Sequence, residues 1–327
     1  MKARIQYVMP ALATLLLSCL ASGQEPAASY PSKPVTIIVP ATAGASFDRN
    51  ARLYARELGD RLRQPFVVDF KPGAGGTIAA AFVAKAAPDG HVITLISPSF
   101  TIAPLLYKDL PYDPVKSFAP ISLASSAPYI FVVHPSVPAR TLSEYIALAR
   151  ANPGKINIGT TGVGAFNHLL AAWLHIATGT KATFVPYKGG PLYMADLLAG
   201  RIDGGISSIP FVTPYVTAGK LRAIGVTSAR RNPVVPDLPT FAEQGVPGYD
   251  AVNWLGFLAP AKTPGPIVAK LSAEFAKALK QSDVMGMLKV DGAQPVGSTP
   301  EQFSQFLVAE MARWRKLVQD GNVLKRD

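Results

Sequence analysis

The chain has 327 residues, of which 49% are hydrophobic and 16% charged, and its formal net charge is +11. The basic residues are interspersed with acidic ones instead of gathering in one stretch, which argues against nucleic acid as a partner and leaves a mild attraction for anions. At about 100–200 residues per domain, the length suits two lobes.

The first segment of the chain has the order of an export signal. Lys2 and Arg4 precede an apolar run from Met9 to Leu20, and small residues follow. The run is shorter than the roughly 20 residues that a membrane-spanning helix needs, and no later segment is long and apolar enough to span a membrane. We therefore expect residues 1–23 to be a signal peptide and the mature chain to reach the periplasm. Because this segment carries two basic and no acidic side chains, its removal changes the charge from +11 to +9.

The single cysteine, Cys19, lies inside this segment. The mature chain then has no cysteine, so it can form no disulfide in an oxidising compartment and supports no thiol chemistry. Leu16-Leu17-Ser18-Cys19 also resembles a lipoprotein box, although a leucine two positions before the cysteine is unusual for that motif. A lipid anchor at Cys19 is the alternative to cleavage near Gly23.

Short β-branched segments then alternate with amphipathic ones. Strands are predicted at residues 35–39, 66–70, 91–97, 130–134, 156–160, 183–187, 202–207, 221–227 and 252–258. Helices are predicted at residues 48–63, 77–87, 141–151, 164–178, 191–199 and 213–218. This βαβα order predicts an α/β fold with mainly parallel sheets that are covered by helices on both faces.

One helix boundary has a specific signal, and the C-terminal part has a different pattern. Thr141 followed by Glu144 predicts a capping box at a helix start. Further on, helices are predicted at residues 266–281, 284–290 and 300–320 with no strand between them. These helices need a sheet formed by earlier segments to pack against.

The simplest arrangement of these elements has two lobes. We expect residues 30–127 and 252–327 to form the first lobe and residues 128–251 the second, with crossing strands near Ile130 and Val252 as the hinge. Open parallel sheets present loops and helix N-termini at the carboxyl ends of their strands. The cleft between the lobes is therefore the expected ligand site.

Two turns between a strand and a helix could hold an anion in that cleft. Residues 43–48 follow the first strand, and the unpaired backbone amides of such a turn attract anions, although Ser46 or Asp48 could serve only as an N-cap. Residues 160–168 also follow a strand and open a helix, in the second lobe, although their Gly and Thr residues suit a purely structural turn as well. Two helix N-termini that face one cleft could grip a carboxylate without arginine.

Other motifs argue against catalysis, nucleotides and metals. Residues 71–76 form a Gly-rich turn that lacks the Gly-Lys-Ser/Thr ending of a phosphate loop, so they either line the cleft mouth or pack under the first turn. None of the four histidines has the spacing of a chelating pair, and no serine lies in Gly-x-Ser-x-Gly. No pair of carboxylates is singled out for hydrolysis. We expect a protein that is not an enzyme and has no metal or cofactor.

A series of short motifs runs in order along nearly the whole mature chain. It comprises Ile38-Val39-Pro40, Ala43-Gly44, Pro72-Gly73-Ala74-Gly75-Gly76, Ala87-Pro88-Asp89-Gly90, Tyr112-Asp113-Pro114, Pro153-Gly154-Lys155, residues 162–169, Val185-Pro186-Tyr187-Lys188-Gly189, residues 237–240, Trp254, Ala259-Pro260 and Ser298-Thr299-Pro300-Glu301. The series resembles the Bug family of substrate-binding receptors of tripartite tricarboxylate transporters. The resemblance implies a two-lobed, type II-like periplasmic binding protein that works with a small and a large membrane subunit. It also implies that the ligand carboxylate is held by the loop after the first strand and by the turn at Thr160.

This chain departs from the family pattern in the expected pocket. Relatives usually read Gly-Gly-x-Thr-Asp where this chain has Gly44-Ala45-Ser46-Phe47-Asp48, and many have an aspartate at the position of Ser207. The missing acid argues against a ligand ammonium. Phe47 and Phe166 add rings that suit an aromatic or long apolar ligand, and the alternative is that both rings pack within the lobes.

These arguments predict a set of ligand-binding residues and a function. The residues are Ala45, Ser46, Phe47, Asp48, Thr160, Thr161, Gly164, Ala165, Phe166, Ser207 and Asn253. A second ligand carboxylate would meet Asn253, Trp254 or a bridging water. The predicted function is uptake of a small organic carboxylate, for example a phthalate isomer, by a monomeric receptor that serves a tripartite transporter. The alternative is an orphan receptor that presents its ligand to a sensor kinase, and neighbouring genes would distinguish the two.

Overall fold

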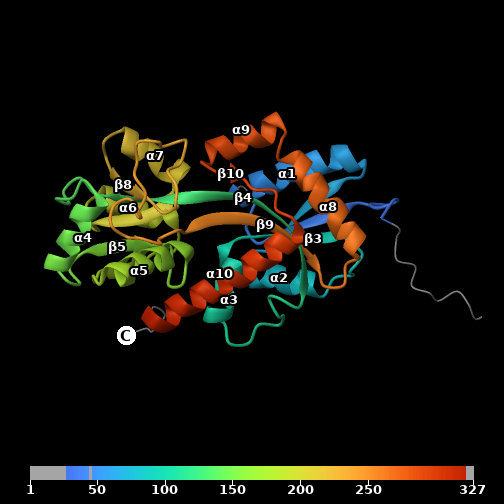
Figure 1. The fold of residues 1–327 in the computed structure, drawn as a ribbon, viewed down its shortest axis with the longest axis horizontal. Helices are drawn as coiled ribbons and strands as arrows, with labels where there is room; N and C mark the ends of the chain where they lie inside the picture. The colour runs from blue at the N-terminus through green and yellow to red at the C-terminus, as the bar shows by residue number, and fades with distance from the viewer. Residues whose placement is uncertain (1–26, 44–45, 322–327) are drawn as a thin grey trace, which may run out of the picture.

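The computed structural model of the chain describes residues 27–43 and 46–321. The expected signal peptide, with Cys19, lies outside the described residues. Within these ranges, no helix combines the length and the apolar character that crossing a membrane requires. Figure 1 shows an elongated molecule of two halves that are connected by two long strands. We call the half that contains the first strand the first lobe and the other half the second lobe.

The first lobe is built on three parallel strands. β1 (Val35–Val39) lies between β2 (Phe66–Phe70) and β3 (Val92–Ile96). The apolar side chains of β1 are buried on both faces, as expected for an inner strand covered by helices on each side. The helical segments of this lobe are α1 (Ser46–Leu62), η1 (Ala74–Gly76), α2 (Thr77–Ala84) and α3 (Pro98–Leu106). α3 was not predicted from the sequence, because Pro104 interrupts its helical pattern.

Two long strands run between the lobes. β4 (Phe118–Val133) and β9 (Val252–Pro260) are antiparallel, with Phe118 opposite Pro260 and Pro128 opposite Val252. β9 also pairs with β3 in the first lobe, and the far end of β4 pairs with strands of the second lobe. The expected crossing strands are present, and they add antiparallel pairs to a sheet that is parallel within each lobe.

The second lobe repeats the alternation of strands and helices. Its strands are β5 (Asn157–Thr160), β6 (Thr183–Pro186), β7 (Gly204–Ser208) and β8 (Arg222–Val226). Its helices are α4 (Leu142–Ala151), α5 (Phe166–Thr178), α6 (Gly190–Leu198) and α7 (Ile209–Thr217). β5 is parallel to β6 and β7, while β7 and β8 are antiparallel to β4. The predicted α/β class with two lobes is confirmed, whereas the residue boundaries of the lobes stay a prediction.

The capping box predicted at the start of α4 is present, and it differs from the standard motif in one hydrogen-bond donor. The Thr141 hydroxyl accepts a hydrogen bond from the Glu144 amide at 3.1 Å, as a capping box requires. The Glu144 carboxylate, however, accepts from the amide of Arg140 at 2.6 Å, one residue earlier than expected. Both contacts satisfy backbone donors that a helix start leaves without intrahelical partners.

The C-terminal helices join the two lobes. They are α8 (Gly265–Ala278), α9 (Ser282–Val290) and α10 (Pro300–Gly321), and the short β10 (Gln294–Pro295), which pairs with β4, lies between α9 and α10. No strand was expected between these helices. This expectation was wrong, because β10 forms a two-residue pairing with β4. Figure 1 shows α10 running obliquely across both lobes. Phe303 near its start is buried in the core of the first lobe, and Trp314 near its end is buried in the core of the second.

The packing of α10 on the connecting strand leads to a stability prediction. A Cβ atom at Gly256 of β9 would lie 2.2 Å from the ring of Phe303, which is itself fully buried. We expect Gly256→Ala to lower the free energy of unfolding by about 1–3 kcal/mol, as overpacking of a core does. Chemical denaturation measures this loss.

The matched control is Gly286→Ala in α9, where an added Cβ meets nothing within 4 Å. This change should stabilise the protein by about 0.5–1 kcal/mol, because alanine is the better helix former. Equal effects of the two substitutions would contradict the close packing of Phe303 on β9.

Candidate functional site

A cavity of about 150 Å³ lies between the lobes, beside the two connecting strands. Its walls come from both lobes: Phe47, Asn50, Ser125, Ala127, Tyr129, Ser208, Pro210, Asn253, Trp254, Leu255, Asp291 and Ala293. An engineered apolar cavity of roughly this volume accepts benzene, so the space suits a small organic molecule. A more open and mainly apolar groove of about 920 Å³ adjoins it between α7 and α9, and Pro210 and Ala293 line both spaces.

The start of α1 forms part of the first-lobe wall. Phe47, in the first turn of α1, lines the cavity and also packs against the first-lobe core. Asp48 is buried and forms an ion pair with Arg52. Ala45 lies outside the described residues, and of Ser46 only the backbone at the helix start is described. The first turn of α1 thus brings Phe47, of the residues expected there, to the cavity.

The second-lobe wall contains a different helix start from the one expected. Ser208 occupies the N-cap position of α7, and both Ser208 and Pro210 line the cavity. The first amides of a helix lack intrahelical partners and carry a partial positive charge, so such a terminus favours an anion. The start of this helix was predicted at residue 213, so the N-cap at Ser208 was missed.

The turn that begins at Thr160 does not line the cavity. Thr161 donates to the Asn167 side chain from its amide at 3.2 Å and from its hydroxyl at 2.9 Å. Gly164 has a φ of 76°, and a Cβ atom there would lie 2.4 Å from Leu106 of α3. Ala165 is the N-cap residue of α5. The described contacts therefore fix this turn against the first lobe, and its role in ligand binding stays a prediction.

The aromatic residue that reaches the cavity from the second lobe is Tyr129. Phe166 lies behind it, with its ring 5.4 Å from that of Tyr129 and 5.8 Å from that of Trp314, both edge to face. Phe166 is buried and belongs to the second-lobe core. Of the two phenylalanines that the sequence singled out, only Phe47 lines the cavity.

Several hydroxyl groups gather on the second-lobe side. Burial, with a smaller contribution from the neighbouring Tyr193, raises the pKa of Tyr129 to about 12. Burial also raises the pKa of Tyr193 to about 12, while Ser207 acts in the opposite direction. Within the described residues, the buried Thr160 hydroxyl makes no hydrogen bond. These groups stay neutral near pH 7, and Tyr129, which lines the cavity, can donate a hydrogen bond to an anion there.

Asp291 is the one charged side chain among the described residues that line this cavity. It follows α9 in the first lobe, forms an ion pair with Arg49 and accepts a hydrogen bond from the Asn50 amide group at 3.3 Å. No local sequence signal pointed to Asn50, Ser125, Tyr129, Ser208 or Asp291. They meet only because α1, β4, α7 and the segment after α9 converge on one cavity.

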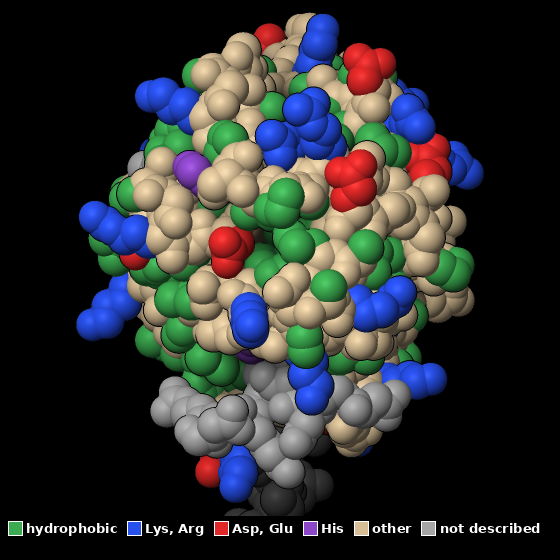
Figure 2. All heavy atoms as spheres, turned by 90° about the vertical axis from the view of Figure 1, so that its left-hand side faces the viewer, with side chains coloured by type: hydrophobic (Ala, Val, Ile, Leu, Met, Phe, Trp, Pro, Cys, Tyr) green, Lys and Arg blue, Asp and Glu red, His purple; other side chains and the backbone are tan. Residues whose placement is uncertain are grey.

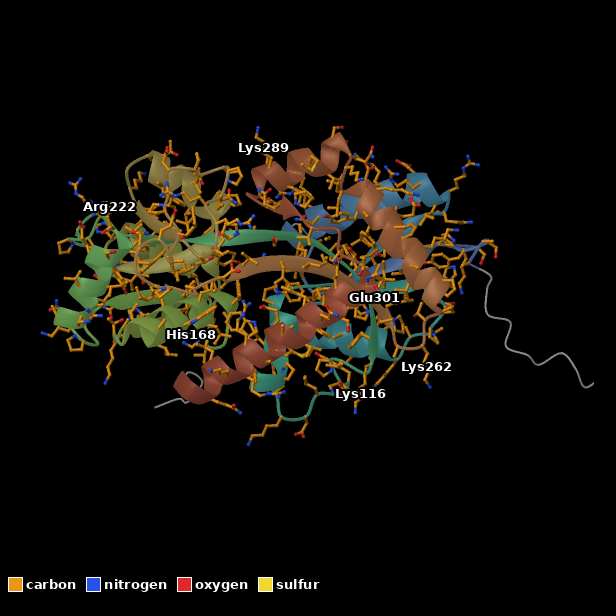
Figure 3. The ribbon with its side chains drawn as sticks, in the orientation of Figure 1. Lys116, His168, Arg222, Lys262, Lys289 and Glu301 are labelled. Atoms are coloured by element: carbon orange, nitrogen blue, oxygen red, sulfur yellow. The ribbon has the colours of Figure 1, made fainter. Side chains whose placement is uncertain are left out.

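Charge elsewhere on the surface is dispersed. Figure 2 shows Lys and Arg side chains scattered over the end of the second lobe without a continuous basic patch. Lys289 projects outward from α9, and His168 and Arg222 lie in the second lobe, apart from one another (Figure 3). Among residues 27–43 and 46–321, no group of His, Cys, Asp and Glu side chains has the geometry of a metal site.

Known proteins are similar to this chain in sequence and in fold. A family profile described as "Tripartite tricarboxylate transporter family receptor" matches residues 50–323. Protein BugT of Bordetella pertussis is 34% identical over 294 residues, which cover 89% of this chain and 90% of that protein. The structure of R. palustris Rpa4515 with adipate has a TM-score of 0.79 at 34% identity and covers 90% of this chain and 99% of its own. The structure of MatC from Rhodopseudomonas palustris with bound malate has a TM-score of 0.74 at 34% identity and covers 88% of this chain and 100% of its own.

Proposed function

The chain belongs to the tripartite tricarboxylate transporter receptor family, whose members are solute-binding receptors and not enzymes, and from this premise we propose that it binds a small organic carboxylate in the periplasm. The observation that carries this proposal is the cavity between the lobes. Its second-lobe wall offers Tyr129, Ser208 and the start of α7, and its first-lobe wall offers Asn253 and the start of α1.

These donors suit a carboxylate because they are neutral and fixed in place. Among residues 27–43 and 46–321, no lysine or arginine lines the cavity. Backbone amides at helix starts and hydroxyl groups can stabilise a charged oxygen pair, and hydrogen bonds to charged groups are shorter and stronger than neutral ones. Adipate and malate in the solved structures of two relatives support a carboxylate as the ligand class.

The finer proposal concerns the body of the ligand and its delivery. Phe47, Tyr129 and Trp254 line the cavity, and their rings suit an aromatic mono- or dicarboxylate such as a phthalate isomer. The receptor delivers its ligand to a small and a large membrane subunit of a tripartite transporter. Loss of growth on the ligand after deletion of the receptor gene, restored by the gene in trans, tests this role.

The first test of carboxylate binding compares acids with their methyl esters. We expect the ester to bind at least about ten-fold more weakly than the free acid, because it lacks the charge that the fixed donors stabilise. A thermal-shift panel identifies the acid, since a ligand at 100 times its Kd adds about 2.7 kcal/mol of stability. Calorimetry on the mature protein then gives the Kd values of the acid and its ester. Equal affinities for the two would refute carboxylate recognition.

A further inference from the structure

Residues 291–293, which we call the strap, form an edge of the cavity between the lobes. Asp291 and Ala293 line the cavity, and Gly292 between them is buried. The strap is fixed to the first lobe, because Asp291 forms an ion pair with Arg49 of α1 and Ala293 packs in the first-lobe core. The strap therefore moves with the first lobe.

Asn232 of the second lobe makes a hydrogen bond to the strap. Its side-chain amide donates to the Gly292 carbonyl at 2.7 Å, and Asn232 is only 3% exposed. Its side-chain oxygen accepts from the Val234 amide at 2.9 Å, so the second lobe fixes the orientation of this side chain. A buried hydrogen bond thus joins the two lobes at the edge of the cavity.

The backbone of Gly292 also packs closely on the second lobe. Its φ is 63°, in the left-handed region that glycine adopts without strain. A Cβ atom at this position would lie 2.6 Å from Cδ1 of Ile209, the first residue of α7, which is buried in the second lobe. The contact between the strap and α7 therefore leaves no room for a side chain at residue 292.

These contacts exist only while the lobes are closed. A solute leaves a cavity between two lobes when the lobes separate, and separation here breaks the Asn232–Gly292 hydrogen bond. In the open conformation water satisfies both groups, whereas in the closed conformation a lost partner leaves a buried polar group unsatisfied. The hydrogen bond therefore stabilises the closed conformation relative to the open one.

We propose that Asn232 and the strap form a latch that slows release of the ligand. Asn232 is a positioning residue in this latch: it acts through the strap, whose Asp291 and Ala293 line the cavity. The inference rests on the proposed function, because it concerns the release of the ligand that the cavity binds.

The experiment measures dissociation and association rates of the mature protein by stopped-flow mixing with adipate, malate and phthalate. Asn232→Asp keeps an oxygen for the Val234 amide, removes the donor to the strap and places a carboxylate against the Gly292 carbonyl. Dissociation should become at least about ten-fold faster, because the closed conformation loses a buried hydrogen bond. Association should stay within about two-fold of wild type, because it begins from the open conformation.

The matched control for this variant is Asn152→Asp. The Asn152 side-chain amide donates to the Leu148 carbonyl at 3.1 Å, and both residues belong to the second lobe. The control therefore removes the same kind of donor and adds the same charge without touching the strap. Its dissociation rate should stay within about two-fold of wild type, as for a substitution without shared partners.

Gly292→Ala tests the packing of the strap independently. Its backbone strain is present in the open and closed conformations, whereas its Cβ meets Ile209 only in the closed one. Dissociation should become at least about five-fold faster, because overpacking destabilises the closed conformation alone. Gly179→Ala is the control, since Gly179 has a φ of 61° and an added Cβ there meets nothing within 4 Å. It should release the ligand as wild type does.

The outcomes separate this inference from the proposed function. Circular dichroism confirms that each variant is folded, and Gly292→Ala gives an independent answer if Asn232→Asp is not. Wild-type dissociation rates in both strap variants overturn the latch and leave the carboxylate receptor intact. Equal acceleration in the variants and their controls also overturns the latch. Failure of every acid in the thermal-shift panel to bind overturns the proposed function and the latch together.

Discussion

Removing the Tyr129 hydroxyl should weaken binding of the ligand carboxylate by roughly ten- to hundred-fold, because a hydrogen bond to a charged group contributes about 1.5–3 kcal/mol. Tyr129 lines the cavity from β4, opposite Ser208 of β7. Tyr129→Phe keeps the ring, which packs edge-on against Phe166, so the fold and the cavity shape should persist. Calorimetric titration of wild type and variant with the same acid measures the loss.

The matched control for this prediction is Tyr187→Phe. The Tyr187 hydroxyl donates to Asp196 at 2.8 Å, and Tyr187 does not line the cavity. This variant should bind the ligand as wild type does. Since the pKa of Tyr129 is about 12, its contribution should not change with pH across the neutral range. Unchanged affinity in Tyr129→Phe would place the carboxylate elsewhere, with the turn at Thr160 as the next candidate.

The second large effect concerns Glu310 of α10, a buried carboxylate between the lobes. Its Oε2 atom accepts hydrogen bonds from the indole of Trp254 at 3.3 Å and from that of Trp314 at 3.1 Å, and its Oε1 atom pairs with Arg313 at 2.9 Å. We expect Glu310→Ala to lower the free energy of unfolding by about 3–5 kcal/mol, because it leaves two buried indole donors and a guanidinium without their partner. The matched control is Gln305→Ala on the exposed face of the same helix, which should change the free energy of unfolding by less than about 0.5 kcal/mol.

The pH dependence of Glu310→Gln tests the charge itself. Burial raises the pKa of Glu310 above the ordinary glutamate value. The folded state therefore binds this proton more tightly than the unfolded state, and the associated stability is lost as the pH rises through the folded pKa. As the pH rises from the pKa of Glu310 in the unfolded chain to its pKa in the folded protein, wild type should thus lose stability relative to Glu310→Gln. Denaturation curves whose difference stays constant with pH would contradict the raised pKa.

The sequence was most informative where one segment decides its own structure. β1, β2 and β6 begin at the predicted residues, because β-branched and aromatic runs between turn residues favour strands. The start of α4 was readable from Thr141 and Glu144, since a capping box is a local signal. α7 was harder, because Pro214 interrupts its helical pattern, and its true start at Ile209 was missed.

The site was harder to predict than the fold for a physical reason. Phe47 and Asn253 were expected and line the cavity, because each follows a recognisable motif or strand. Asp291 and Arg49 are 242 residues apart, and only the packing of the segment after α9 on α1 brings them together. Neither has a sequence neighbour that signals this contact. A cavity between two lobes depends on such long-range packing, which a single sequence does not encode in any local pattern.

The course of α10 also determines from which side a solute arrives. Separating the lobes at α10 would pull Phe303 or Trp314 out of a core, whereas the side between α7 and α9 is a groove with the Asn232–Gly292 hydrogen bond across it. For the carboxylate ligand proposed above, we therefore expect an approach past Lys289 and Arg49, which flank that groove and the cavity. Because exposed charges attract distant ions only within about 10 Å at 0.1 M salt, association should slow as ionic strength rises, while dissociation from the closed cavity should not.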